Sequence, residues 1–133
     1  MSTEKDIERK IIMDTCKIGC RLFKNNVGSA TIKNPDTGKE YRVNFGLCKG
    51  SSDLIGWTPV AITNEMVGKT IAIFTAVEVK KDVSKKYNKD RMESQQKFID
   101  IVNKNGGIAF KSDNPDEAIK TIIERTRPAQ PNK

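Results

Sequence analysis

Two short apolar runs with charged residues at fixed places constrain this chain more than any other feature. The first, GSSDLIG at residues 50–56, carries Asp53, and the second, VEVK at residues 77–80, alternates valine with charge. In a β-strand, residues two apart point to the same face. We therefore expect Glu78 and Lys80 to project together, with the two valines facing a core on the other side. A surface ion pair on an edge strand is the alternative interpretation.

The length and composition indicate one small α/β domain. The chain has 133 residues, of which 36% are hydrophobic, and this is long enough for a real core. We expect one domain over residues 1–126 and a flexible, proline-containing tail over residues 127–133. No run approaches the roughly 20 apolar residues of a membrane span, and no secretory signal opens the sequence. A cytosolic protein is therefore expected.

The charge balance and the missing histidine restrict the chemistry. The chain has 24 basic and 17 acidic residues, a net charge of +7, and no histidine. The excess of positive charge favours a polyanionic partner such as nucleic acid. The lack of histidine excludes His-based acid/base chemistry, Ser-His-Asp and Cys-His triads, and His-ligated zinc. An enzyme built from this chain must use carboxylates, lysine, a hydroxyl or a metal-bound water.

Periodicity and turn residues predict the order helix, sheet, helix, strand, helix. We expect a first helix capped by Thr3 and ended by Gly19, and a second that Asn105-Gly106-Gly107 stops. Turn residues 34–38 between alternating segments predict a hairpin. The second helix is predicted over residues 92–102. The remaining predicted elements are an extended segment from Leu22, strands 52–57, 69–79 and 108–110, and a last helix capped by Asp113 or Asn114 with Pro115 at its start.

The three cysteines do not form a metal-ligand pattern. Cys16, Cys20 and Cys48 are odd in number, and we expect them to be reduced. Cys16 and Cys20, four residues apart, are interpreted as one face of a helix, because no histidine or further cysteine would complete a zinc site.

Carboxylates and a lysine are the candidates for catalysis. Asp53 and Glu78 are a suitable pair for Mg²⁺, which prefers oxygen ligands, and the backbone carbonyl of Val79 is a further candidate ligand. Such a metal would sit beside a reacting phosphate. Lys80 could orient or deprotonate a water, or stabilise developing charge.

Two further pairs of residues have an open interpretation. Glu4 and Glu8 lie one helical turn apart, so either could add a third acid, or both could simply favour the positive end of the helix dipole. Gln95 and Gln96 open the apolar face of the second predicted helix. Either glutamine could hydrogen-bond a site group, or could be a solvated helix residue.

Several polar and basic residues are candidates for contacting nucleic acid. Asn25 and Asn26, before Gly28, suit a phosphate contact or form a plain turn. The lysine-rich segment 80–97 could follow a DNA backbone or be a solvated loop. Trp57 is interpreted as a core residue rather than a base-stacking one. The predicted DNA-binding residues are Lys24, Asn25, Asn26, Lys81, Lys85, Lys86, Lys89 and Arg91.

The ordered set of motifs resembles a known family. An acidic first helix is followed by KNNVG at 24–28, GSSDLIG at 50–56, AVEVK at 76–80, Gln95 with Phe98 three residues on, and GGIA at 106–109. This order resembles the virus-type replication-repair nuclease family, VRR-NUC, a branch of the PD-(D/E)xK nuclease superfamily, over about residues 4–125.

The resemblance implies a fold and a set of site residues. The implied fold is a restriction-endonuclease-like core, a mixed β-sheet flanked by helices, and the implied activity is metal-dependent cleavage of DNA with Mg²⁺ or Mn²⁺. Asp53, Glu78 and Lys80 match the D…(D/E)xK positions, and Gln95 matches the helix glutamine of the family. The first-helix acid falls on Glu4 or Glu8. Ser52 replaces the proline often found before the aspartate.

The resemblance also implies a substrate class. Small stand-alone members resemble virus-encoded homodimeric nucleases that act on branched DNA such as four-way (Holliday) junctions, which a symmetric dimer suits. Three alternatives stay open: a nuclease of the same fold with nicking or restriction-like specificity, a non-catalytic DNA-binding protein, and a structural protein. The last leaves the placement of Glu78 and Lys80 unexplained.

Overall fold

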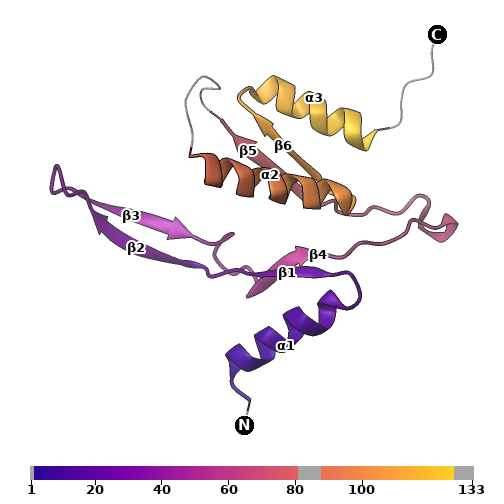
Figure 1. Cartoon of the computed structure of the whole chain (residues 1–133), viewed down its shortest axis with the longest axis horizontal. Coiled ribbons are helices and arrows are strands. Elements are labelled where there is room, and N and C mark those ends of the chain that lie inside the picture. The colour runs from indigo at the N-terminus through magenta and orange to yellow at the C-terminus, as the bar shows by residue number, and fades with distance from the viewer. Residues whose placement is uncertain (1, 81–87, 128–133) are drawn as a thin grey trace. The chain divides into compact units, whose positions relative to one another are not determined.

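A computed structural model describes residues 2–80 and 88–127 of the chain. The chain divides into two compact units, Met1–Val60 and Ala61–Lys133, and each has its own helices and strands (Figure 1). Among the described residues, the strands pair as three two-stranded sheets: β1 with β4, β2 with β3, and β5 with β6. The first two pairs are antiparallel and the third is parallel.

Helix α1, Glu4–Cys16, opens the first unit as the sequence predicts. Thr3 is its N-cap: the Thr3 hydroxyl accepts a hydrogen bond from the backbone N–H of Asp6 at 3.2 Å, and the Asp6 carboxylate accepts one from the Thr3 N–H at 3.1 Å. This reciprocal capping box satisfies two backbone donors that the helix itself leaves unpaired. Two hydrogen bonds with Thr3 hold the pKa of Asp6 below its usual 3.8. The larger effect comes from the backbone of Thr3 and the smaller from the Thr3 side chain.

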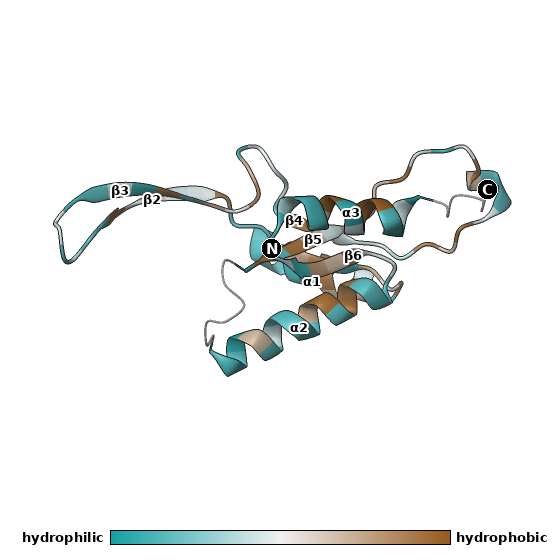
Figure 2. Cartoon of the chain, turned by 90° about the horizontal axis from the view of Figure 1, so that it is seen from above, coloured by the Kyte–Doolittle hydropathy of each residue, from teal (hydrophilic) through white to brown (hydrophobic). Residues whose placement is uncertain are grey.

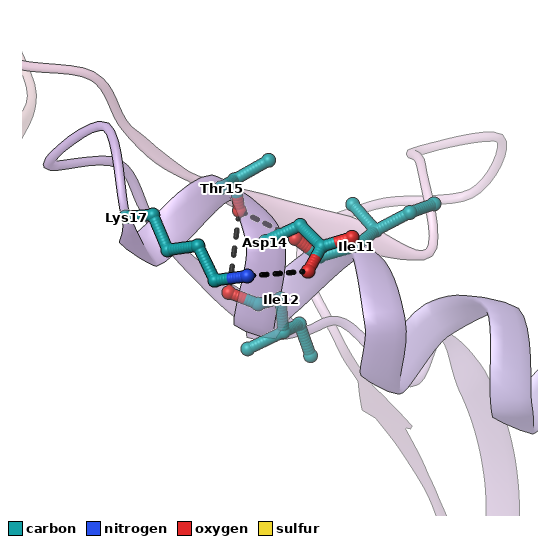
Figure 3. Close-up of polar contacts among 5 residues, drawn as sticks. All are labelled: Ile11, Ile12, Asp14, Thr15 and Lys17. Atoms are coloured by element: carbon teal, nitrogen blue, oxygen red, sulfur yellow. Dashed lines mark hydrogen bonds and ion pairs between the residues drawn. The ribbon is translucent and has the colours of Figure 1, made fainter.

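The end of α1 differs from the prediction. The helix ends at Cys16, and Gly19 takes the left-handed turn beyond it, with φ at +83°. Figure 3 shows this last turn, where the Thr15 hydroxyl donates to the carbonyl of Ile11 at 2.6 Å and Lys17 pairs with Asp14 at 3.4 Å.

The interpretation of Cys16 and Cys20 as one helix face is therefore wrong. Cys20 lies beyond the helix, is buried, and accepts a hydrogen bond from the Thr58 hydroxyl at 3.3 Å. All three cysteines, Cys48 included, are free thiols.

The strands of the first unit follow local turn signals. β1, Arg21–Lys24, pairs with β4, Leu54–Trp57, so that Lys24 lies opposite Leu54. β2, Gly28–Lys33, and β3, Glu40–Phe45, form the predicted hairpin. The Asn34 side chain accepts from the N–H of Asp36 at 2.9 Å within the turn, which is how asparagine stabilises such turns.

The second unit contains the parallel strand pair and two helices. After a 3₁₀ turn at Asn64–Met66 come β5, Thr75–Val79, and α2, Lys89–Lys104. They are followed by β6, Ile108–Ser112, and α3, Pro115–Thr126. Asn114 caps α3, accepting from the N–H groups of Asp116 and Glu117, as one of the two predicted caps.

The predicted strand 69–79 is only partly right. Residues 69–74 have no regular structure, and β5 begins at Thr75. The partner strand β6 explains the limit, because its ladder starts at Ile108, directly after Gly106-Gly107. A strand extends only as far as a neighbour pairs with it.

The core of the second unit lies between α2 and β6. Its buried side chains are Ile99, Val102, Ile108 and Ala109. Figure 2 shows α2 mostly hydrophilic over its first turns, with hydrophobic patches further along. Its buried residues, Ile99 and Val102, belong to the second half of the helix. A Cβ on Gly107 would meet Val102 Cγ1 at 2.6 Å. The space that the Val102 side chain leaves therefore favours glycine at this position.

The expectation for the two valines of β5 is wrong. Glu78 and Lys80 do share a face, which is half-buried to buried, whereas Val77 is 39% and Val79 is 75% exposed. The reason is α2, whose Gln95 contacts both charged residues and so packs on their side of the strand. None of the helices in the described ranges is long and apolar enough to cross a membrane.

Candidate active site

The first unit brings three carboxylates together. Glu4 and Glu8 lie one turn apart on α1, and Asp53 lies just before β4. One carboxylate oxygen of each residue lies within 4.8 Å of the others, and we name these three residues the acid cluster. The structure thus places both first-helix candidates beside Asp53. The alternative interpretation, in which both glutamates only favour the positive end of the helix dipole, does not explain why they lie close to Asp53.

A lysine side chain contacts the acid cluster. Nζ of Lys24, at the end of β1, lies 3.3 Å from Oε2 of Glu8, whose side chain is 16% exposed. That same oxygen is buried and has no hydrogen bond of good geometry among the described residues. The contact between Lys24 and Glu8 is therefore a charge attraction and not a well-directed hydrogen bond. Three carboxylates and one ammonium leave an excess of negative charge at this place.

The loop that carries Asp53 is held by Asn25. The Asn25 backbone N–H donates to the Asp53 carbonyl at 2.7 Å. Its Nδ2 donates to the Ser51 hydroxyl at 2.7 Å and to the Ser52 carbonyl at 2.9 Å, and its Oδ1 accepts from the Leu47 N–H at 2.9 Å. This set of contacts could not be found from the sequence, because it depends on how a distant loop closes.

The two glycines that bracket the first motif have backbone roles. Gly50 has φ at +85°, a region that other residues rarely adopt. A Cβ on Gly56 would lie 1.7 Å from the Arg21 carbonyl oxygen, so only glycine permits the close approach of β1 and β4. The motif therefore fixes the backbone on both sides of Asp53.

The second unit holds the glutamate and lysine in one hydrogen-bonded set. Gln95 Nε2 donates to Glu78 Oε1 at 2.7 Å, and Lys80 Nζ donates to Gln95 Oε1 at 2.8 Å. Lys80 Nζ also lies 3.4 Å from Glu78 Oε1. The Lys80 side chain is 11% exposed and that of Glu78 is 33% exposed. We name these three residues the Glu78–Gln95–Lys80 set.

The structure shows which of the two glutamines of α2 contacts Glu78 and Lys80. Gln95 faces β5, whereas Gln96 is exposed and donates to Asp100, four residues on in the same helix, at 2.8 Å. The backbone continues the ladder past Val79, since the Lys80 N–H donates to the Ser112 carbonyl at 3.0 Å. This hydrogen bond holds the backbone of Lys80 next to β6.

A pocket of about 310 Å³ lies beside this set, between β5 and α2. Glu78, Gln95, Arg91 and Phe98 are among the residues that line it. Arg91, one of the predicted DNA-binding residues, thus stands next to the Glu78–Gln95–Lys80 set.

The other predicted DNA-binding residues fall in several places. Lys24 and Asn25 make the contacts described above, Asn26 is exposed after β1, and Lys89 is exposed in the first turn of α2. Lys81, Lys85 and Lys86 lie outside the described residues. Trp57 packs its ring against Phe23, with centroids 5.4 Å apart, and is half-buried, so it makes a packing contact without lying in the buried core.

A model of the VRR-NUC domain matches residues 3–111. The chain belongs to the VRR-NUC family. The match spans α1, the acid cluster and the Glu78–Gln95–Lys80 set, and it includes residues of both compact units. Neither a search of curated proteins nor a search of solved structures found a match.

Membership in VRR-NUC confirms the family resemblance and the fold class. This is a nuclease domain of the α/β, restriction-endonuclease-like fold, and its substrate is DNA. Hydrolysis of the nucleic-acid backbone is the activity that the family implies. The individual roles of the site residues stay predictions.

Proposed function

We propose that this VRR-NUC domain is a Mg²⁺- or Mn²⁺-dependent endonuclease that cuts branched DNA, such as a four-way junction, as a homodimer. The observation that carries the chemical part is the acid cluster, in which oxygens of Glu4, Glu8 and Asp53 lie within 4.8 Å of one another. The enzyme is expected to work in a reducing compartment, in keeping with its three free thiols.

The donor set fits a hard divalent cation. All three ligands are carboxylate oxygens, which Mg²⁺ and Mn²⁺ prefer over nitrogen or sulfur. Like charges this close repel one another, so a cation among them relieves an unfavourable arrangement. When bound, such an ion supplies an activated water and neutralises charge on the phosphate. Asp53 with Glu4 or Glu8 would hold it. Glu78 and the Val79 carbonyl, which the sequence also predicts as ligands, belong to the second unit.

We assign Lys80 to proton transfer or to stabilisation of charge in the proposed reaction. Its side chain is largely buried and its ammonium donates to Gln95, so its position is fixed before any substrate binds. Held this way, the ammonium can orient a water or stabilise the charge that develops on the phosphate, whereas accepting the proton of that water requires the neutral amine. Gln95 restricts both Glu78 and Lys80, since it bonds one through each end of its amide.

Branched DNA is the proposed substrate because of charge and size. The net charge of +7 suits a polyanion, and minimal members of this family resemble junction-cutting nucleases. A two-fold dimer would present two sites to the two strands of a symmetric junction. The alternatives are nicking or restriction-like cleavage, and DNA binding without cleavage.

The test compares a labelled four-way junction with a linear duplex of matched length and sequence. Purified protein is incubated with each DNA in Mg²⁺, Mn²⁺ or EDTA, and its oligomeric state is measured by sedimentation. We expect junction cleavage with either metal, none in EDTA, and a dimer. Equal cleavage of both DNAs would discard the junction preference. Tight, salt-dependent binding without cleavage in any metal would instead favour the DNA-binding alternative.

A further inference from the structure

We infer that Asn25 is a positioning residue that sets the geometry of the acid cluster by holding the loop that carries Asp53. This inference rests on the proposed function, because it concerns how the proposed cation ligands are arranged. It gives Asn25 a role other than contacting the DNA backbone.

Asn25 makes four hydrogen bonds to the loop that carries Asp53. The backbone N–H of Asn25 bonds the Asp53 carbonyl, and its side chain bonds Leu47, Ser51 and Ser52, all between 2.7 and 2.9 Å. These are short, well-formed hydrogen bonds. They span the segment that leads into Asp53, which places the aspartate's Cα relative to the end of β1.

Only asparagine among the small polar residues fits this arrangement. The side-chain amide offers two N–H donors and an oxygen acceptor, and here the donors serve Ser51 and Ser52 while the oxygen serves Leu47. Aspartate would keep the acceptor but lose both donors. Alanine would lose all three bonds, including the partly buried one to the Ser51 hydroxyl.

The neighbouring residue completes the connection. Lys24 contacts Glu8 of α1, and Asn25 contacts the Asp53 loop, so two consecutive residues at the end of β1 reach both segments that supply the acids. In metal sites, residues that orient the ligands typically affect affinity or activity by about 10–100-fold when changed. Asn25 would act through the backbone that carries Asp53 rather than through a bond to its carboxylate.

The experiment uses the full chain and compares Asn25→Ala with Asn34→Ala. Asn34 is a matched control of the same type in the same unit, whose side chain also accepts backbone N–H groups, but in the turn between β2 and β3. Mn²⁺ affinity is measured by calorimetry on metal-free protein, thermal stability is measured in EDTA, and kcat and KM are measured on a DNA junction.

We expect Asn25→Ala to weaken Mn²⁺ binding about 10–100-fold, to lower kcat more than it raises KM, and to recover part of its activity at higher Mn²⁺. Asn34→Ala is expected to lose stability while keeping the Mn²⁺ affinity of the wild type. Should Asn25→Ala not fold, Ser51→Ala removes one end of the same contact and is expected to weaken Mn²⁺ binding in the same direction by a smaller factor.

The inference is overturned if Asn25→Ala behaves as Asn34→Ala does, or if a folded Ser51→Ala binds Mn²⁺ like the wild type where Asn25→Ala is unfolded. Asp53→Ala separates this result from a failure of the proposed function. If Asp53→Ala abolishes Mn²⁺ binding while Asn25→Ala does not weaken it, only the role of Asn25 is rejected. If Asp53→Ala binds Mn²⁺ and cuts DNA normally, the proposed function itself is rejected.

Discussion

Gln95 accepts a hydrogen bond from Nζ of Lys80 at 2.8 Å. The glutamine comes from α2 and the lysine directly follows β5, so the bond connects the helix to the end of the strand. The other end of the same amide donates to Glu78. One neutral side chain thereby fixes both charged groups of the VEVK motif, and this arrangement leads to the first prediction.

Replacing Gln95 by alanine is expected to lower kcat by about 10–100-fold, because Glu78 and Lys80 lose the group that orients them. Single-turnover cleavage of a labelled junction at saturating metal measures this effect. Gln96→Ala is the matched control, since the neighbouring glutamine bonds only Asp100 on the exposed side of α2. Equal activity of the two variants would show that the contacts of Gln95 do not matter for the reaction.

Replacing Lys80 by methionine is expected to lower kcat by about 100-fold or more, in the range of a lost acid/base or charge-stabilising group. Methionine keeps much of the length of the lysine side chain, so the buried stem still packs. The junction should still bind in EDTA, which is measured by fluorescence anisotropy. Normal turnover by a folded Lys80→Met protein would remove this residue from the chemistry.

Replacing Lys24 by methionine is expected to raise the affinity for Mn²⁺, because Glu8 loses the ammonium that lies 3.3 Å from it. Calorimetric titration of the metal-free protein measures this. Lys17→Met removes the exposed pair with Asp14 in the same unit and should leave the affinity unchanged. Weaker Mn²⁺ binding by Lys24→Met than by Lys17→Met would contradict the prediction.

The local start of α1 predicts a response to acid. The pKa of Asp6 is lowered by its bonds to Thr3, so the carboxylate stabilises the folded helix start above pH 3.8. This contribution is lost as the pH falls through the lowered folded-state pKa. Titration of the Asp6 side chain by NMR should give a pKa below 3.8, and Thr3→Ala should raise it. An Asp6 pKa at or above 3.8 in the wild type would contradict the capping account.

Local signals in the sequence predicted the elements that depend on neighbouring residues. Thr3 caps α1, residues 34–38 turn the hairpin, and Asn114 caps α3, because each arrangement is closed within a few residues. The predictions that were wrong depended on distant partners. The length of β5 is limited by β6, and the burial of its two faces is decided by the position of α2.

The same distinction applies to the candidate site. The alternation of residues 77–80 correctly placed Glu78 and Lys80 on one face, since that follows from strand geometry alone. The choice between Gln95 and Gln96 needed the angle at which α2 meets β5. The contacts of Lys24 and Asn25 depend on how α1 and the loop before β4 close on the end of β1, and no periodicity in the sequence reports that closure.

The most direct test of the account is the cleavage of a four-way junction by wild-type protein and by Asp53→Asn, with DNA binding in EDTA as the control for folding. Asparagine keeps the shape of the side chain and removes its charge. The account predicts that Asp53→Asn binds the junction as tightly as the wild type in EDTA but does not cut it in Mg²⁺ or Mn²⁺. Cleavage by Asp53→Asn at the wild-type rate would contradict the assignment of the acid cluster to catalysis.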